Sequence, residues 1–114
     1  MMIEEQIFDA LKSLVSNRCY PLLMPENPTY PSIVFTRISS TPENTLNGPA
    51  TIDQVRFQID SYAETYAGAK ALAASVRTAM EAAAFKGLLQ TDQDFFEPDV
   101  TIYRVTQDFY VWRK

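Results

Sequence analysis

Residues 51–62, Thr-Ile-Asp-Gln-Val-Arg-Phe-Gln-Ile-Asp-Ser-Tyr, hold the pattern from which the fold of this chain is deduced. Val55, Phe57 and Ile59 alternate with polar residues, which is the period of a β-strand with one buried and one polar face. Such alternation is typical of antiparallel sheets that have one face on the core and the other in solvent. Residues 51–62 are therefore predicted to form one strand of a sheet that is covered on a single side.

Three further segments are predicted as strands. Residues 32–39 are rich in β-branched and aromatic side chains, and residues 88–96 carry apolar side chains at both ends. Residues 100–112 follow a turn at 97–99 and alternate like the first strand. Their apolar side holds Tyr103, Val105, Phe109 and Val111, and their other side holds Ile102, Arg104, Thr106, Asp108, Tyr110 and Trp112.

Two helices are predicted from apolar residues that recur every three or four positions. The first covers residues 3–15, and the second covers the alanine-rich residues 65–85, with Gly87 as its stop. Residues 17–31 contain four prolines and are predicted to be a long connection rather than a continuation of the first helix.

The order of elements predicts an α+β fold, α-β-β-α-β-β, in which two helices pack on one face of a mainly antiparallel four-stranded sheet. With 114 residues, the chain is expected to form a single domain over 1–114. We expect the core to contain Ile7, Leu11, Leu14, Phe57, Ile59, Leu72, Val76, Met80, Val105 and Phe109.

Residues 40–50 are predicted to form a long loop between two strands. The segment holds several turn-forming residues, and Glu43 is its only charged residue. Long loops in compact domains are commonly functional, so we interpret this one as an assembly arm, with Glu43, Asn44 and Asn47 as candidate interface residues.

Composition excludes several classes of function. Ten Lys and Arg against fourteen Asp and Glu give a net charge of −4, which provides no basic field for a nucleic-acid backbone. The chain has no histidine and a single cysteine, Cys19, which removes histidine-based catalysis and ordinary zinc sites. The start of the chain is acidic and no stretch has the length of a membrane span, so we expect a soluble intracellular protein without membrane contact.

Other candidate sites are weak. The acidic residues Asp92, Asp94, Glu97 and Asp99 could hold a hard cation, but their spacing matches no EF-hand loop and a solvated turn is favoured. Cys19 has no partner base and is interpreted as a structural thiol. Only three glycines occur, so no phosphate-binding loop is present. We expect no cofactor, no metal and no enzymatic activity.

Two features favour contact with other proteins. The polar side of the predicted sheet carries a mixture of Arg and aromatic residues, which is enriched at interfaces, although a plain solvated face would look similar. The candidate interface residues there are Arg56, Arg104, Asp108, Tyr110 and Trp112. Arg104 and Asp108 share a face, so they could order each other or pair with a neighbouring subunit. The alanine-rich helix could also let a subunit approach, although helix propensity is the favoured explanation of its alanines.

The closing run Tyr103-Arg104-Val105-Thr106-Gln107-Asp108-Phe109-Tyr110-Val111-Trp112 resembles the last segment of the tail completion or head–tail joining family of tailed bacteriophages. Residues 2–11, 31–35 and 58–62 are similar to the opening helix and the first two strands of that family. The resemblance covers nearly the whole chain.

This resemblance implies a tail terminator: a homo-oligomeric ring, a hexamer in such proteins, that caps the tail tube protein and meets the head–tail connector proteins. It implies a place in the virion tail, with the host bacterial cytoplasm as the site of assembly. The alternative is a small monomeric ligand-binding or regulatory module that uses a pocket between the alanine-rich helix and the sheet. An enzyme that uses carboxylates and Tyr is the least favoured hypothesis.

Overall fold

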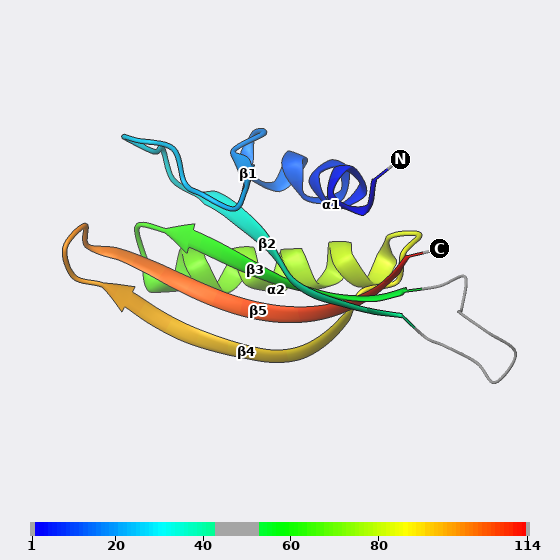
Figure 1. The fold of residues 1–114 in the computed structure, drawn as a ribbon. Helices are drawn as coiled ribbons and strands as arrows, with labels where there is room; N and C mark the ends of the chain where they lie inside the picture. The colour runs from blue at the N-terminus through cyan, green and yellow to red at the C-terminus, as the bar shows by residue number, and fades with distance from the viewer. Residues whose placement is uncertain (1, 43–52, 114) are drawn as a thin grey trace, which may run out of the picture.

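A computed structural model describes residues 2–42 and 53–113 of the chain. The helices are α1 (Ile3–Leu11), the 3-10 helix η1 (Lys12–Val15) that continues it, and α2 (Tyr66–Ala82). The strands are β1 (Cys19–Pro21), β2 (Ser32–Pro42), β3 (Asp53–Ala63), β4 (Leu88–Glu97) and β5 (Ile102–Arg113), arranged as in Figure 1.

The strands form one five-stranded mixed sheet in the order β1-β2-β3-β5-β4. All neighbours are antiparallel except β1, which runs parallel to β2. The predicted α+β class with two helices is confirmed, but the expectation of four strands was wrong. The missed strand β1 has only three residues and lies in the proline-rich connection, where no periodic pattern can reveal it. Ile33 N–H donating to Arg18 O and Leu22 N–H donating to Phe35 O hold it against β2.

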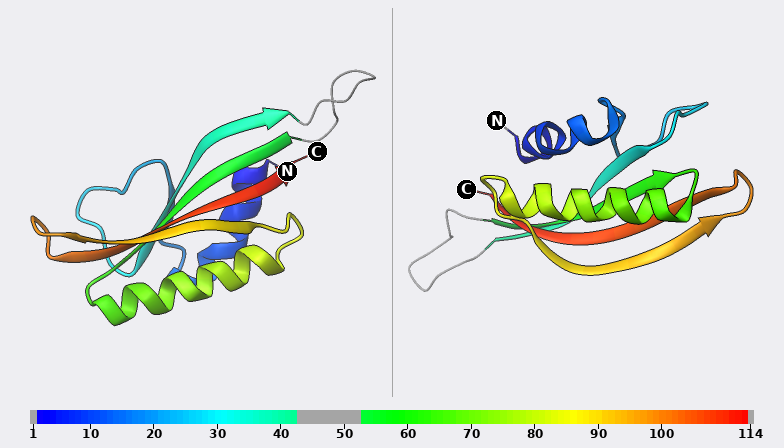
Figure 2. Two further views of the ribbon diagram at one scale, coloured as in Figure 1. Left: turned by 90° about the horizontal axis from the view of Figure 1, so that it is seen from below. Right: turned by 180° about the vertical axis from the view of Figure 1, so that it is seen from behind.

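Both helices lie on the same side of the sheet, as Figure 2 shows, and no described helix lies on the other side. The predicted alternation in β3 and β5 is confirmed, because Val55, Phe57 and Ile59 face the helices. The ten residues expected in the core are buried, except that Leu14 is only partly buried at its margin. Burial of these apolar side chains is the main stabilising contribution to the fold.

Helix α2 begins one residue later than predicted, because Thr65 is its N-cap: the Thr65 Oγ1 accepts a hydrogen bond of 3.0 Å from Gly68 N–H. It ends at Ala82, earlier than predicted. Gly87 is therefore not the stop. Instead its N–H donates to Met80 O at 2.9 Å, and a Cβ at residue 87 would lie 3.2 Å from that oxygen, so the close approach favours glycine.

The strand predicted over residues 32–39 is longer than the sequence indicated. Ser40 belongs to β2, which continues to Pro42, so the loop expected over 40–50 begins later. The rest of that loop, with Glu43, Asn44 and Asn47, lies outside the described residues. The weakly patterned segment 88–96 is a strand as predicted, with a bulge between Leu89 and Thr91.

Candidate functional site: the open face of the sheet

The side of the sheet that none of the described helices covers is called the open face. It brings together the five residues that the sequence proposed on the sheet. Arg104, Asp108, Tyr110 and Trp112 alternate along β5 with residues that face the core, and Arg56 of β3 lies directly opposite Tyr110. All five are partly exposed. The structure therefore places these side chains on one surface, which is a requirement for a shared contact.

Arg56 and Asp108 form an ion pair across this face, with 2.8 Å between Arg56 Nη2 and Asp108 Oδ2. The same carboxylate oxygen accepts a hydrogen bond of 3.1 Å from Thr91 Oγ1 of β4. The hydrogen bond to Asp108 raises the pKa of the Arg56 guanidinium above its ordinary value. Three strands thus share one polar cluster, and the free side of the guanidinium remains open to solvent.

A second cluster lies beside the first and is buried. Asp60 is only 4% exposed although it lies on the open face. Its carboxylate accepts hydrogen bonds from Thr106 Oγ1 at 2.6 Å and from Gln58 Nε2 at 3.1 Å. A buried carboxylate needs such donors, because an unpaired charge out of water is costly. Asp60 therefore orders the middle of the face.

Arg104 does not pair with Asp108, contrary to one possibility raised by their spacing. Its Nη2 lies 3.1 Å from Glu97 Oε1 of β4, and its guanidinium stacks 4.7 Å from the ring centre of Phe95. The register of β4 on β5 explains both contacts of Arg104. Phe95 lies directly opposite Arg104, and Glu97 lies two residues further along the same side of β4. Arg104 is therefore held within its own subunit.

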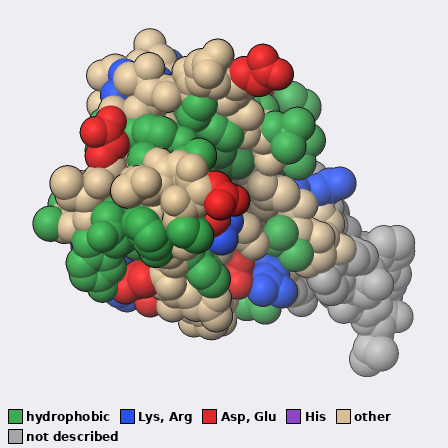
Figure 3. Space-filling model, turned by 90° about the vertical axis from the view of Figure 1, so that its left-hand side faces the viewer, with side chains coloured by type: hydrophobic (Ala, Val, Ile, Leu, Met, Phe, Trp, Pro, Cys, Tyr) green, Lys and Arg blue, Asp and Glu red, His purple; other side chains and the backbone are tan. Residues whose placement is uncertain are grey.

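An aromatic cluster at one end of the molecule was missed by the sequence analysis. Tyr103 packs against Phe96 with ring centres 4.9 Å apart and against Tyr66 of α2 at 5.8 Å. Phe96 is 47% exposed and Tyr66 is 49% exposed. Figure 3 faces this end of the molecule, where hydrophobic side chains gather between acidic and basic ones. The signal available in the sequence was the pair of phenylalanines, Phe95 and Phe96, that follows the polar stretch 90–94.

Asp94 ties β4 to the start of α2. Its carboxylate accepts a hydrogen bond of 2.6 Å from Tyr66 Oη and lies 3.3 Å from Lys70 Nζ. The hydrogen bond from Tyr66 lowers the pKa of Asp94, and the same bond raises the pKa of Tyr66. Tyr66 and Lys70 are one helical turn apart, so both reach the same carboxylate.

The acidic residues around Asp94 do not converge on one point. Asp92 and Asp94 lie on the helix side of β4, whereas Glu97 lies on the open face and pairs with Arg104. Over the described ranges, no group of three His, Cys, Asp or Glu residues could hold a metal ion. The structure gives this segment a structural role through Asp94 and Glu97.

Cys19 lies in β1 and is buried at 3% exposure. Burial raises the pKa of its thiol to about 12, so the nucleophilic thiolate is suppressed near neutral pH. This agrees with a structural thiol.

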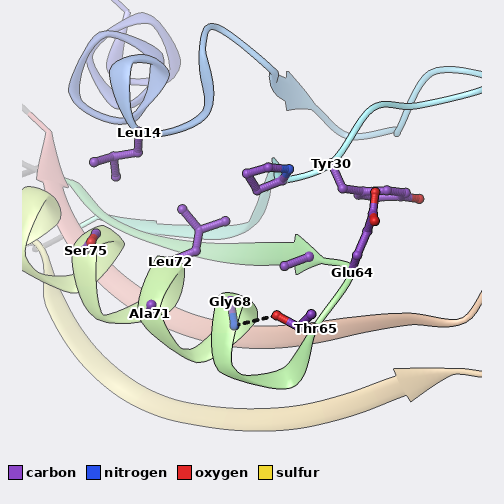
Figure 4. Close-up of a pocket in the computed structure, with 10 residues that line it drawn as sticks. Leu14, Tyr30, Glu64, Thr65, Gly68, Ala71, Leu72 and Ser75 are labelled. Carbon is purple, nitrogen blue, oxygen red and sulfur yellow. Dashed lines mark hydrogen bonds between the residues drawn. The ribbon is translucent and has the colours of Figure 1, made fainter.

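Core side chains of α2 and of the sheet pack against each other in the part of the chain that the structure describes. A cavity of about 510 Å³ lies between α2, the end of β3 at Ala63 and the N-terminal segments. Figure 4 shows Leu14 and Leu72 bordering it, with Tyr30 and Glu64 at its far end. Glu64 is the only charged residue of its lining. The cavity therefore offers few groups that could orient a polar ligand.

None of the described helices is both long and apolar enough to cross a membrane.

Comparison with known proteins finds one family model and a solved structure with a similar fold. A family model described as tail completion protein gp17 matches residues 7–114. Among solved structures, a chain of the virion of a native gene transfer agent particle has a similar fold, with a TM-score of 0.63 and 16% sequence identity. The match covers 93% of this chain and 90% of that chain. No curated protein sequence matches this chain.

Proposed function

The chain belongs to the tail completion protein gp17 family and is a structural protein of a phage-type tail, and on this basis we propose that it assembles as a ring at the head-proximal end of the tail tube. There the ring stops tube growth and helps to join the tail to the head. Residues 1–114 act as one tail-terminator-like domain. Its work is binding, with no covalent bond made or broken and no cofactor used.

The observation that carries this proposal is the open face. In a protein of this size, helices could cover both sides of a sheet, but neither described helix lies over β3, β5 and β4 on the open face. It holds Arg56, Tyr110 and Trp112, which are residue types enriched among the few side chains that dominate binding energy at interfaces. The clusters around Asp60 and Asp108 hold the surface in one arrangement before binding, which lowers the entropy cost of association.

Termination requires two different surfaces. A tube of stacked rings stops growing when a different ring covers its end. One side of that ring binds the tube, and its other side does not bind another tube ring. We assign the fit to the tail tube protein to the open face. The aromatic cluster of Phe96, Tyr66 and Tyr103 is a second, separate surface for the head–tail connector proteins.

The homo-oligomer is a hexamer by resemblance to tail terminators. The chain assembles in the host bacterial cytoplasm and then resides in the virion tail. The alternative, a monomeric ligand-binding module, requires a monomer whose melting temperature rises with a small ligand.

The test is a pair of variants in the parent phage or prophage. Tyr110→Ala with Trp112→Ala removes both aromatic side chains from the open face, and Thr78→Ala is the control because Thr78 is exposed on α2, away from that face. We expect particles with the double variant to lack this chain at the tail end and to carry overlong or unattached tails. Normal tails from the double variant would refute the assignment of the open face.

A further inference from the structure

The aromatic cluster of Tyr66, Phe96 and Tyr103 is only partly covered by the rest of the chain. Tyr66 and Phe96 are half-exposed, and Val100 in the turn between β4 and β5 is exposed as well. The cluster is also fixed in position, because Tyr66 Oη donates a hydrogen bond of 2.6 Å to Asp94. Rigid aromatic side chains that remain exposed are typical anchors of protein interfaces.

Two acidic side chains border this cluster without a basic partner. Glu64 follows Ala63, which lies directly opposite Tyr103, and it precedes the N-cap of α2. Asp99 lies in the turn that follows Phe96 and joins β4 to β5. Both are exposed, and neither forms an ion pair with a side chain that the structure describes. Acidic side chains accordingly lie beside the hydrophobic ones at this end of the molecule in Figure 3.

The hairpin of β4 and β5 already shows how a ring and a carboxylate together bind a cation. Arg104 lies 4.7 Å from the ring centre of Phe95, and its Nη2 lies 3.1 Å from Glu97 Oε1. A planar guanidinium can stack on an aromatic ring while its N–H groups bind a carboxylate, which suits arginine better than lysine. On the side of the hairpin that faces α2, Phe96 presents a second ring and Asp99 follows it with a second carboxylate. Neither of these contacts a described basic side chain.

A second copy of this chain is a poor source of such a cation. The chain has ten Lys and Arg against fourteen Asp and Glu, so two copies repel each other overall. Half of its basic side chains are already paired with its own acids, namely Lys12, Arg56, Lys70, Arg77 and Arg104. A different protein with a basic surface is therefore the complementary partner, because opposite charges speed encounter and exclude wrong partners.

We propose that the aromatic cluster, with Glu64 and Asp99 at its border, binds an arginine-bearing segment of a head–tail connector protein. The inference rests on the proposed function, which assigns this cluster to the connector, and adds the chemistry by which the partner is recognised. A guanidinium of that segment stacks on the exposed ring of Phe96 or Tyr66 and donates hydrogen bonds to one of the two carboxylates. The apolar part of the segment covers Val100 and the remaining ring edges.

The test mixes tails that carry a variant of this chain with purified heads of the parent phage and counts joined particles. Glu64→Lys combined with Asp99→Lys reverses the charge of the border, and Phe96→Ala removes one ring; all three positions are exposed, so the fold is retained. We expect either change to lower the fraction of tails joined to heads by about tenfold or more, with tail length unchanged. Asp9→Lys combined with Glu81→Lys reverses two exposed acids on α1 and α2 and is the matched control, which should join normally.

Salt gives an independent readout of the same contact. Joining by unaltered tails should weaken from about 50 mM to about 300 mM NaCl, because salt screens exposed charges. Joining by tails with Glu64→Gln and Asp99→Asn should start lower and depend less on salt.

The outcomes separate the contact from the ring. Loss of joining from only one of the two changes, the charge reversal or Phe96→Ala, would overturn the proposal, because an arginine bound in this way needs both the carboxylate and the ring. Normal joining by all variants would also overturn it, while leaving the ring on the tail intact. Tails that lack the chain altogether and still join heads at normal length would instead refute the proposed function.

Discussion

Arg56 of β3 and Asp108 of β5 form an ion pair of 2.8 Å on the open face of the sheet. The two residues are 52 positions apart in the sequence, and antiparallel pairing of β3 with β5 brings them together. The Asp108 side chain is 16% exposed and the Arg56 side chain is 43% exposed. The carboxylate is therefore mostly buried, whereas the guanidinium is accessible to a partner. An arginine anchored in this way is a preorganised contact for a partner.

Arg56→Gln is expected to change the free energy of unfolding little, because the ion pair is partly exposed and screened by solvent. The same variant should strongly reduce the amount of this chain found in purified tails. Arg77→Gln is the control, since it removes an exposed ion pair with Glu81 on α2. Equal incorporation of the two variants, measured by quantitative blotting, would show that Arg56 makes no contact.

Phe57→Ala should lower the free energy of unfolding by about 3–5 kcal/mol, because the ring is completely buried and its loss leaves a cavity. Phe95→Ala is the matched control at a ring that is 39% exposed, and it should have a much smaller effect. Denaturant titration of both variants measures the difference. A loss below about 1 kcal/mol for Phe57→Ala would contradict the assignment of that side chain to the core.

Thr65→Ala should destabilise the protein by about 1 kcal/mol, because Gly68 N–H loses its hydrogen bond at the start of α2. Thr65→Ser keeps the capping oxygen and should stay close to the unaltered chain. Thermal unfolding followed by circular dichroism separates the two variants. Equal melting temperatures would mean that the cap does not contribute.

Cys19 should resist alkylation by iodoacetamide at pH 8 in the folded protein and react readily after unfolding. Burial raises the pKa of this thiol to about 12, so the folded state keeps its proton when the unfolded state has lost it. Stability is therefore fully present below the ordinary thiol pKa and falls as the pH rises toward about 12. Cys19→Ala should remove this part of the alkaline destabilisation, which unfolding titrations from pH 8 to about 10.5 measure against the unaltered chain. An identical pH dependence in both proteins would contradict it.

The strands and helices with a clear hydrophobic periodicity could be predicted from the sequence. The alternation in β3 predicted that Val55, Phe57 and Ile59 are buried. The same pattern in β5 predicted that Arg104, Asp108 and Tyr110 lie on one face. β1 could not be predicted, because three residues between turns carry no period and are held by backbone hydrogen bonds to β2.

The side-chain contacts between neighbouring strands could not be predicted from the sequence for a related reason. Arg104 selects Glu97 over Asp108 because the register of β4 on β5 brings Glu97 within reach. Asp94 meets Tyr66 across 28 positions only because α2 lies over β4 and β5. Such contacts depend on the relative placement of elements, which local spacing does not encode.

The central claim is that this chain ends the growth of the tail tube. Electron microscopy of particles assembled without the chain, with the length of every tail and its attachment to a head recorded, tests that claim most directly. We predict a broad distribution of overlong tails that lack heads, restored to a single length when the chain is supplied in trans. Tails of normal length joined to heads in the absence of the chain would contradict it.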